Sequence, residues 1–270
     1  MIRAALVCLC LAACAQPTAA PATPLTEALL AHARTWSGAD LSEFARAELD
    51  RIAARIRALH SREPASSMHT LLRRVVFAEF KFVREVDDLS LRFVFLPSVL
   101  QTHRGSCVGL GTLYLALGER LGLDLHGVLV PGHFFVRLRE HGQLRNIELL
   151  REGQELPEAW YRERWPITTG SRAYARALRA AEVEAVVLFD VGNDRRRSGA
   201  YGQAERAFSL AAERFPEFAE AQASAGTMAH LLGALDRARA AYAAARAADP
   251  SLEGLDENVA LLQAEVSGSQ

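Results

Sequence analysis

The chain has 270 residues, of which 50% are hydrophobic, and its 31 basic and 32 acidic side chains leave a formal net charge of -1. This length and composition predict one large or two modest globular domains. The balanced charge gives no electrostatic basis for binding nucleic acid or an acidic lipid surface, so we expect neither as a partner.

The first fourteen residues hold three of the four cysteines and have the order of a targeting signal. Arg3 precedes an apolar run over residues 4–13, which is too short to cross a bilayer and is typical of a secretory signal. The tetrad that ends at Cys14 resembles the lipobox of bacterial lipoproteins, in which the signal is cut before the cysteine and lipid is attached to its thiol. We therefore expect residues 1–13 to be removed and Cys14 to be lipidated. A plain signal peptide cut elsewhere, for example after Ala20, is the alternative.

This signal also predicts where the protein is found. Ala15 follows Cys14, which by resemblance to enteric sorting rules favours the outer membrane. We expect a lipoprotein of the cell envelope that faces the periplasm and touches the membrane through its lipid anchor. After processing, Cys107 is the remaining thiol, so we expect no internal disulfide. Residues 14–25 are rich in Pro, Ala and Thr and predict a flexible tether.

Two helices are expected after the tether, and we assign them packing rather than chemistry. Asp40 and Glu43 have the spacing of a capping box, and the apolar side chains that follow recur at helical spacing. This pattern predicts a helix over about 41–60. Pro64 ends it, and a second, strongly apolar helix is predicted up to about residue 82.

The segment around Cys107 has features that make a thiol reactive. Ser106 is a good N-cap, which places Cys107 in the first turn of the helix that follows. There the unpaired backbone N–H groups and the positive end of the helix dipole favour a thiolate over a thiol. Gly109 and Gly111 weaken the helix, which indicates close backbone contact by a neighbouring strand. A small buried hydrophobe is the alternative for a lone cysteine.

Downstream of this helix the sequence predicts a β-hairpin. A short buried strand is followed by a strand from His133, a polar turn, and a third strand that ends near Leu149. With the turn centred between Glu140 and His141, His133 pairs directly with Glu148. An imidazole and a carboxylate are therefore expected side by side at one end of the hairpin.

Cys107, His133 and Glu148 together have the parts of a Cys-His-acid triad: nucleophile, base and orienter. In this chemistry the histidine takes the thiol proton and returns it to a leaving group, while the acid fixes the histidine tautomer. Each residue alone has a structural alternative, because a histidine often opens a strand as a satisfied polar group and an edge carboxylate is often solvated. Their chain order and the hairpin register favour the triad.

Short motifs stand in a fixed order around these residues: Arg104–Cys107, Leu113–Ala116, Arg120–Leu123 and Val130–Arg137. They resemble the SirB-type branch of the bacterial transglutaminase-like superfamily over roughly residues 66–155. The resemblance implies a papain-like α+β core, with Cys107 on its central helix and His133 and Glu148 on its sheet.

Two departures from the pattern of this superfamily bear on activity. Many SirB-type members lack the cysteine, so the branch includes non-enzymes, and the presence of Cys107 here favours activity. The third triad member is usually Asp in the superfamily, whereas this chain has Ile147-Glu148-Leu149 where Ile-Asp-Pro is common. Asn146 is therefore a competing orienter.

Oxyanion stabilisation is expected partly from the backbone N–H of Cys107 at the start of its helix. Gln101 lies six residues upstream, a separation similar to that in papain-like proteases, and is the candidate second donor. A surface loop is the alternative for Gln101. The aromatic cluster Trp160, Tyr161 and Trp165 either lines a substrate cleft or packs a connecting segment. The sequence has no metal-ligand spacing and no nucleotide-binding glycine pattern, so we expect no metal and no cofactor.

The C-terminal third contains residues that repeat at a separation of 34 positions. The pairs are Gly192 and Gly226, Gly199 and Gly233, Ala204 and Ala238, Phe208 and Tyr242, Ala211 and Ala245, and Pro216 and Pro250. Thirty-four residues is the tetratricopeptide period, which predicts helix-turn-helix units at about 185–218 and 219–252 and a capping helix at 253–264. Such an array offers a surface to a protein partner or shields the neighbouring domain.

These observations predict an α+β transglutaminase-like domain over residues 26–168, with helices at 40–96 and a catalytic core at 97–150, followed by a helical domain at 169–266. The function that follows is a lipid-anchored thiol enzyme that acts on an amide or acyl bond of a protein or peptide through a Cys107 thioester. Peptidase, deamidase and acyltransferase activities all fit. The alternative is a catalytically silent assembly protein, whose fold and repeats serve as binding surfaces.

Overall fold

The computed structural model describes residues 24–167 and 170–268. The expected signal, the lipidation site Cys14 and most of the expected tether lie outside these ranges. Within them, no helix combines the length and the apolar character that a membrane span requires.

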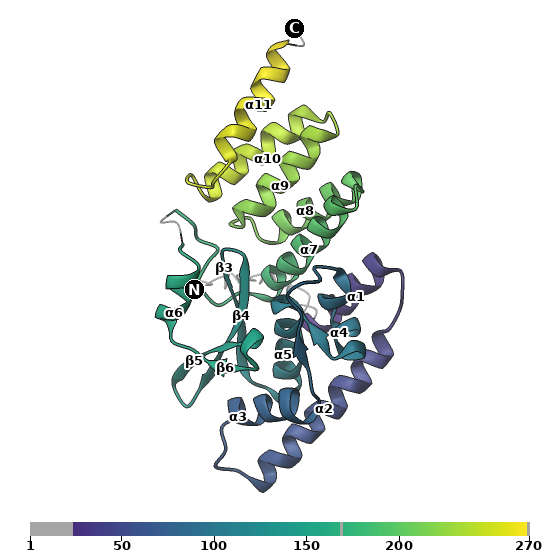
Figure 1. Cartoon of the computed structure of the whole chain (residues 1–270), viewed down its shortest axis with the longest axis vertical. Helices are drawn as coiled ribbons and strands as arrows, with labels where there is room; N and C mark the ends of the chain where they lie inside the picture. The colour runs from purple at the N-terminus through teal and green to yellow at the C-terminus, as the bar shows by residue number, and fades with distance from the viewer. Residues whose placement is uncertain (1–23, 168–169, 269–270) are drawn as a thin grey trace, which may run out of the picture.

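The N-terminal part of the described chain is helical. Its elements are α1 (Leu25–Ser37), α2 (Ser42–Arg62), α3 (Met68–Arg73), the π-helix η1 (Arg74–Glu79), the 3-10 helix η2 (Leu91–Phe93) and α4 (Leu96–Thr102). Most of the apolar stripe of α2 is buried, completely so at Leu49, Ile52 and Ile56, whereas Phe44 near its start is exposed. Helices α1, α2 and α4 all contact the central helix α5 (Cys107–Leu121), so they form its supporting layer (Figure 1).

Three expectations for this part are corrected. Helix α1 was not predicted, and it begins at Leu25, the last residue of the expected tether. The capping box of α2 is absent because Leu41 is the N-cap, and Asp40 Oδ1 instead accepts the backbone N–H of Ser42 at 3.1 Å. The second expected helix is not continuous, since α3 gives way at Arg74 to η1, whose hydrogen bonds reach one residue further along the chain.

Helix α5 packs against a four-stranded antiparallel sheet of order β3-β4-β5-β6. The strands are β3 (Asp124–Val130), β4 (His133–Glu140), β5 (Gln143–Glu148) and β6 (Gln154–Glu155), with the 3-10 helix η3 (Leu149–Arg151) between the last two. Two short strands, β1 (Val83–Arg84) and β2 (Arg104–Gly105), pair in parallel, and β2 leads directly into α5. A Cβ on Gly111 would lie 2.4 Å from the Phe134 ring, so glycine is what allows α5 to approach β4 this closely. The neighbouring strand thus contacts Gly111 with a side-chain ring, and not with its backbone as expected.

The hairpin of β4 and β5 has a tighter turn than expected. His141 and Gly142 have φ angles of 49° and 78°, which is the left-handed conformation of a two-residue type I′ turn. Val136 pairs with Ile147, so the register is two residues away from the expected one. Because a shift of two residues keeps every side chain on its own face, His133 and Glu148 remain neighbours, diagonally rather than directly opposed.

Helix α6 (Glu158–Arg164) follows β6 and covers the outer face of the sheet, where Tyr161 packs on Phe135 with ring centroids 3.9 Å apart. A C-terminal helical array then extends away from the sheet in one row (Figure 1). Its helices are α7 (Ala180–Arg197), α8 (Tyr201–Arg214), α9 (Ala219–Leu231), α10 (Leu235–Ala248) and α11 (Leu255–Gly268). The repeating small residues meet the repeating aromatic rings: a Cβ on Gly192 would lie 2.5 Å from Phe208, and one on Gly226 would lie 2.7 Å from Tyr242.

The segment before α7 attaches the array to the edge of the sheet. The backbone N–H groups of Ala175 and Leu178 donate to the carbonyl groups of Leu129 and Gly127 in β3, at 2.8 and 2.9 Å. The array therefore begins as an extension of the sheet edge, which fixes its first helix next to the end of β3.

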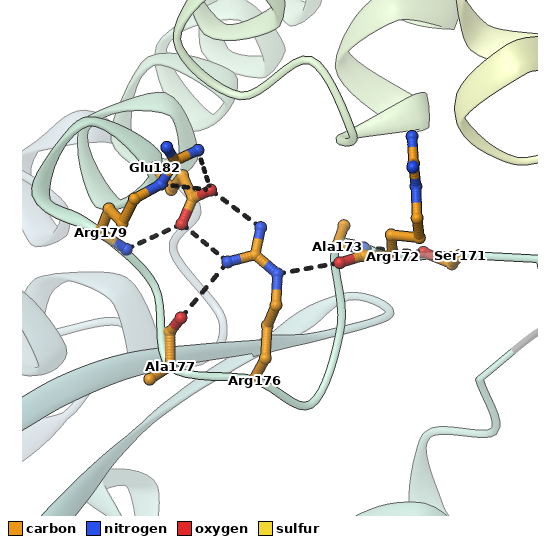
Figure 2. A network of polar contacts seen from close by, with 7 residues as sticks. All are labelled: Ser171, Arg172, Ala173, Arg176, Ala177, Arg179 and Glu182. Carbon is orange, nitrogen blue, oxygen red and sulfur yellow. Dashed lines mark hydrogen bonds and ion pairs between the residues drawn. The ribbon is translucent and has the colours of Figure 1, made fainter.

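A buried carboxylate completes this junction. Figure 2 shows Glu182 of α7 between the guanidinium groups of Arg176 and Arg179, at 2.8 and 2.7 Å. The carboxylate of Glu182 is fully buried, which by itself raises its pKa, but the two arginines and the backbone N–H of Arg179 outweigh burial and lower the pKa to about 2. Glu182 thus stays ionised and holds the start of α7 to the segment that pairs with β3.

Candidate active site

Cys107 is the first residue of α5, as the sequence predicted. The Ser106 side chain accepts the backbone N–H of Gly109 at 3.1 Å and so caps the helix. The carbonyl of Phe93 accepts the N–H of Ser106 at 2.8 Å and would lie 2.1 Å from a Cβ on Gly109, so this glycine contacts η2 rather than a strand. Backbone N–H groups in the first turn have no intrahelical acceptor, which leaves the Cys107 N–H available to an oxyanion.

His133 and Glu148 form a buried pair at the end of the hairpin. Nε2 of His133 lies 2.8 Å from Oε2 of Glu148, and the two residues are 5% and 1% exposed. The second carboxylate oxygen of Glu148 accepts the backbone N–H of Leu150 at 3.0 Å, so the carboxylate is held from two sides. With Nε2 engaged, Nδ1 is the ring nitrogen left for the thiol of Cys107.

The pKa of His133 is raised to about 9. Burial alone lowers it by disfavouring the imidazolium, but hydrogen bonding to Cys107 and Glu148, together with their negative charges, outweighs burial. These contacts favour the protonated form of the imidazole beside the sulfur. A cation in this position stabilises a thiolate, which is the nucleophilic form of cysteine.

An aromatic ring covers this pair. Trp165 stacks on His133 with ring centroids 4.1 Å apart and planes 7° from parallel. Tyr161 lies beneath Trp165, and burial followed by the nearby Glu148 carboxylate raises the pKa of Tyr161, so its hydroxyl stays protonated. The sequence left two roles open for this aromatic cluster, lining a substrate cleft or packing a connecting segment. The structure favours packing, because Trp165 packs directly on His133, the candidate base. Sequence spacing gave no sign of the stack, because Trp165 follows α6 and is separated from His133 in the chain by β5, β6 and α6.

Two further candidates from the sequence lie apart from His133 and Cys107. Asn146 Oδ1 accepts from Nε of Arg137 at 2.6 Å, and its Nδ2 donates to Glu158 at 3.2 Å. Glu148, not Asn146, is thus the residue that contacts His133. Gln101 is exposed on α4 and is not among the described residues that line the cavity beside Cys107.

Arg104 has a contact that the sequence did not reveal. Its guanidinium pairs with the carboxylate of Glu85, whose other oxygen accepts the backbone N–H groups of Val86 and Asp87 at 3.0 and 3.1 Å. The bond from Arg104, followed by those from the backbone, lowers the pKa of Glu85 to about 2. This arrangement fixes the loop that carries Asp88 to the mouth of the cavity.

A cavity of about 310 Å³ opens beside the candidate triad. Cys107 and His133 both line it, together with apolar side chains of α5 and the sheet and with residues of α7 and α9. Its volume is at the lower end of the range for small-molecule sites. Within the described ranges, no group of three or more His, Cys, Asp or Glu side chains is placed to hold a metal ion.

The comparison with known families agrees with this geometry. Residues 43–188 match the family Transglut_core2, described as the transglutaminase-like superfamily. The chain belongs to the transglutaminase-like superfamily. The matched range contains Cys107, His133 and Glu148 and ends within α7, so it extends beyond the range 66–155 that carried the resemblance.

Individual proteins are similar to this transglutaminase-like chain over different lengths. A UPF0162 protein of Vibrio cholerae is 32% identical over 104 residues, which are 37% of this chain and 38% of that protein. The match therefore spans little more than a third of that relative. A crystal structure of menin, which reveals the binding site for Mixed Lineage Leukemia (MLL) protein, is similar with a TM-score of 0.41 and 13% identity over 90% of this chain and 70% of that one. A likeness at this level has no bearing on function.

Proposed function

We propose that this protein is a cysteine enzyme that cleaves or transfers an amide or acyl bond through a thioester on Cys107. The observation that carries the proposal is the buried His133–Glu148 pair beside a thiol at a helix N-terminus. Burying an imidazole and a carboxylate costs solvation that a passive binding surface does not need to lose. Peptidase, deamidase and acyltransferase reactions share this chemistry and differ in the groups that leave and attack.

The first half of the proposed reaction acylates the thiol. The Cys107 thiolate attacks the carbonyl carbon, and the resulting oxyanion accepts the backbone N–H of Cys107. When the tetrahedral intermediate collapses, the bond to the leaving group breaks and the His133 imidazolium gives its proton to that group. Glu148 keeps the imidazole in one orientation throughout.

The second half releases the acyl group. Neutral His133 takes a proton from water or from an incoming amine, which attacks the thioester carbonyl. The bond to sulfur breaks, Cys107 leaves as a thiolate, and the product is an acid or a new amide. The imidazolium–thiolate pair is thereby restored.

The proposal extends to the location and partners of the enzyme. We propose lipidation at Cys14 and a place at the outer membrane facing the periplasm, which the lipobox-like tetrad and the Pro-rich stretch after it support. We also propose that the C-terminal helices are tetratricopeptide repeats that bind a protein partner. The 34-residue spacing of Gly192 with Gly226, each against an aromatic ring, supports this assignment.

Trapping of the acyl-enzyme tests the catalytic proposal. With p-nitrophenyl acetate in excess, we expect a burst of nitrophenol and an acetyl group on Cys107 after acid quench, detected by mass spectrometry of the peptide. The His133→Ala variant should lose the burst, because it lacks the base. A wild-type protein that shows neither burst nor adduct supports the scaffold alternative instead. Capture of bound material from intact cells by Cys107→Ala then identifies the natural substrate.

A further inference from the structure

The C-terminal array supplies one wall of the cavity that contains Cys107. Helix α7 contributes Val186, Phe189, Asp190, Asn193 and Arg197 to this wall. The start of α9 adds Phe218 and Glu220. The rest of the lining comes from the segment 88–94, the start of α5, the end of β3 and the start of β4. Whatever reaches the thiol must therefore fit between the catalytic core and the array.

Asp190 is the carboxylate of this wall that has no partner among the described residues. Its carboxylate is partly buried and makes no hydrogen bond or ion pair with residues of the described ranges. Burial raises the pKa of Asp190 to about 7, and the charge of Arg197 offsets burial only in part. Arg197 is engaged elsewhere, since it donates to the carbonyl of Leu89 at 2.7 Å and lies 3.9 Å from Asp194.

A second carboxylate lies on the same wall. Glu220 accepts a hydrogen bond from the hydroxyl of Tyr174, and burial, the largest influence, raises its pKa. The mouth of the cavity carries Asp88, while Arg197 is the basic residue among the described lining residues besides His133. Three carboxyl groups thus line a largely apolar space with one arginine that is already bonded. A cation bound beside Asp190 would favour its ionised form and would relieve the cost of burying that charge, so the cavity favours a positively charged group.

We propose that the cavity selects substrates with a cationic group, an ammonium or guanidinium, that pairs with Asp190 while the carbonyl to be attacked lies at Cys107. This inference rests on the proposed function. The bound cation is a recognition group and not the attacking amine, because a protonated amine has no free lone pair. Asp190 is then a specificity-determining residue that the helical array supplies to the active site.

Charged thiol reagents of similar size test this selection without knowledge of the natural substrate. The probes are the cationic aminoethyl, the neutral propyl and the anionic sulfonatoethyl methanethiosulfonates, each of which forms a mixed disulfide with Cys107 and releases methanesulfinate. At about pH 8, where Asp190 with its pKa of about 7 is mostly ionised, we expect the ratio of cationic to neutral rates to fall about tenfold in Asp190→Asn, which is the factor that corresponds to 1.4 kcal/mol. The sulfonate should react slowest with the wild type and gain rate in the variant.

A matched control removes the same charge elsewhere. Glu213 is exposed on α8 and does not line the cavity, so Glu213→Gln should leave the rate ratio unchanged. Equal rate ratios in wild type and Asp190→Asn would overturn the proposed subsite. The neutral reagent reports separately on the proposed function: if its rate with Cys107 is that of an ordinary thiol and does not depend on His133, the enzyme proposal fails, whatever the charge preference.

Discussion

Nε2 of His133 lies 2.8 Å from Oε2 of Glu148, in a pair whose members are almost completely buried and whose imidazole is stacked under Trp165. The ring cannot turn without breaking the bond to Glu148 or leaving the face of Trp165. A fixed imidazole at the end of the sheet, next to the N-terminus of α5, is what the proposed mechanism requires to activate Cys107.

The first prediction concerns the titration of His133. We expect its ring to titrate near pH 9 in the wild type, as followed by the histidine resonances in an NMR titration. In Cys107→Ser the midpoint should fall, because the hydrogen bond and negative charge of the sulfur are lost while burial still disfavours the imidazolium. An unchanged midpoint in Cys107→Ser would mean that the sulfur and the imidazole do not interact.

The second prediction separates Glu148 from Asn146 as orienter. Glu148→Gln should slow alkylation of Cys107 at least about tenfold at pH 6, because the amide fits the space but provides no charge to stabilise the imidazolium. Asn146→Ser should have little effect on this rate, since its side chain bonds Arg137 and Glu158 instead. The reverse order of effects would reassign the third member of the triad.

The third prediction tests whether close packing against Phe93 requires glycine at position 109, near the start of α5. Gly109→Ala should destabilise the fold by about 2–3 kcal/mol, because the new Cβ overlaps the carbonyl oxygen of Phe93. Gly202 of α8 has open space around its added Cβ and provides the control. Gly202→Ala should be neutral or stabilising by up to about 1 kcal/mol in urea unfolding.

The fourth prediction concerns the junction between sheet and array. Glu182→Gln should cost on the order of 2–3 kcal/mol at pH 7, less than a wholly buried pair, because Arg179 is largely exposed. Folding lowers the pKa of Glu182 from 4.5 to about 2, so its contribution is present above about pH 4.5 and is lost as the pH falls through about 2. The difference between wild type and variant, measured by urea unfolding, should therefore shrink over this range. A constant difference would show that the charge of Glu182 is not what stabilises the junction.

The sequence predicted the parts of the site that depend on local pattern. Ser106 is a helix cap by residue type, and the alternation of the strand from His133 places its side chains on defined faces. The predicted register was wrong by two residues, but the predicted contact between His133 and Glu148 is still present, since an even shift leaves both side chains on the same face. The signal for the correct register was Gly142, because glycine is favoured where φ is positive and so indicates a two-residue type I′ turn at His141-Gly142.

Contacts between distant segments could not be read from the sequence. Trp165 stacks on a histidine 32 positions earlier, and Arg104 pairs with Glu85 across two short strands. The place of Asp190 in the cavity depends on how α7 leaves the edge of β3, which is set by the pairing of Ala175 and by the Glu182 cluster. No periodicity within α7 indicates which of its faces lines the cavity beside Cys107.

The fifth prediction tests the central claim, that His133 activates Cys107. The measurement is the rate of Cys107 alkylation by iodoacetamide at pH 6 in wild type and His133→Ala. An ordinary thiol has a pKa of about 8.5 and is almost fully protonated at this pH, so the variant should react about a hundredfold more slowly. Rapid wild-type alkylation that depends on His133 is the predicted result, and equally slow alkylation of both proteins would contradict it.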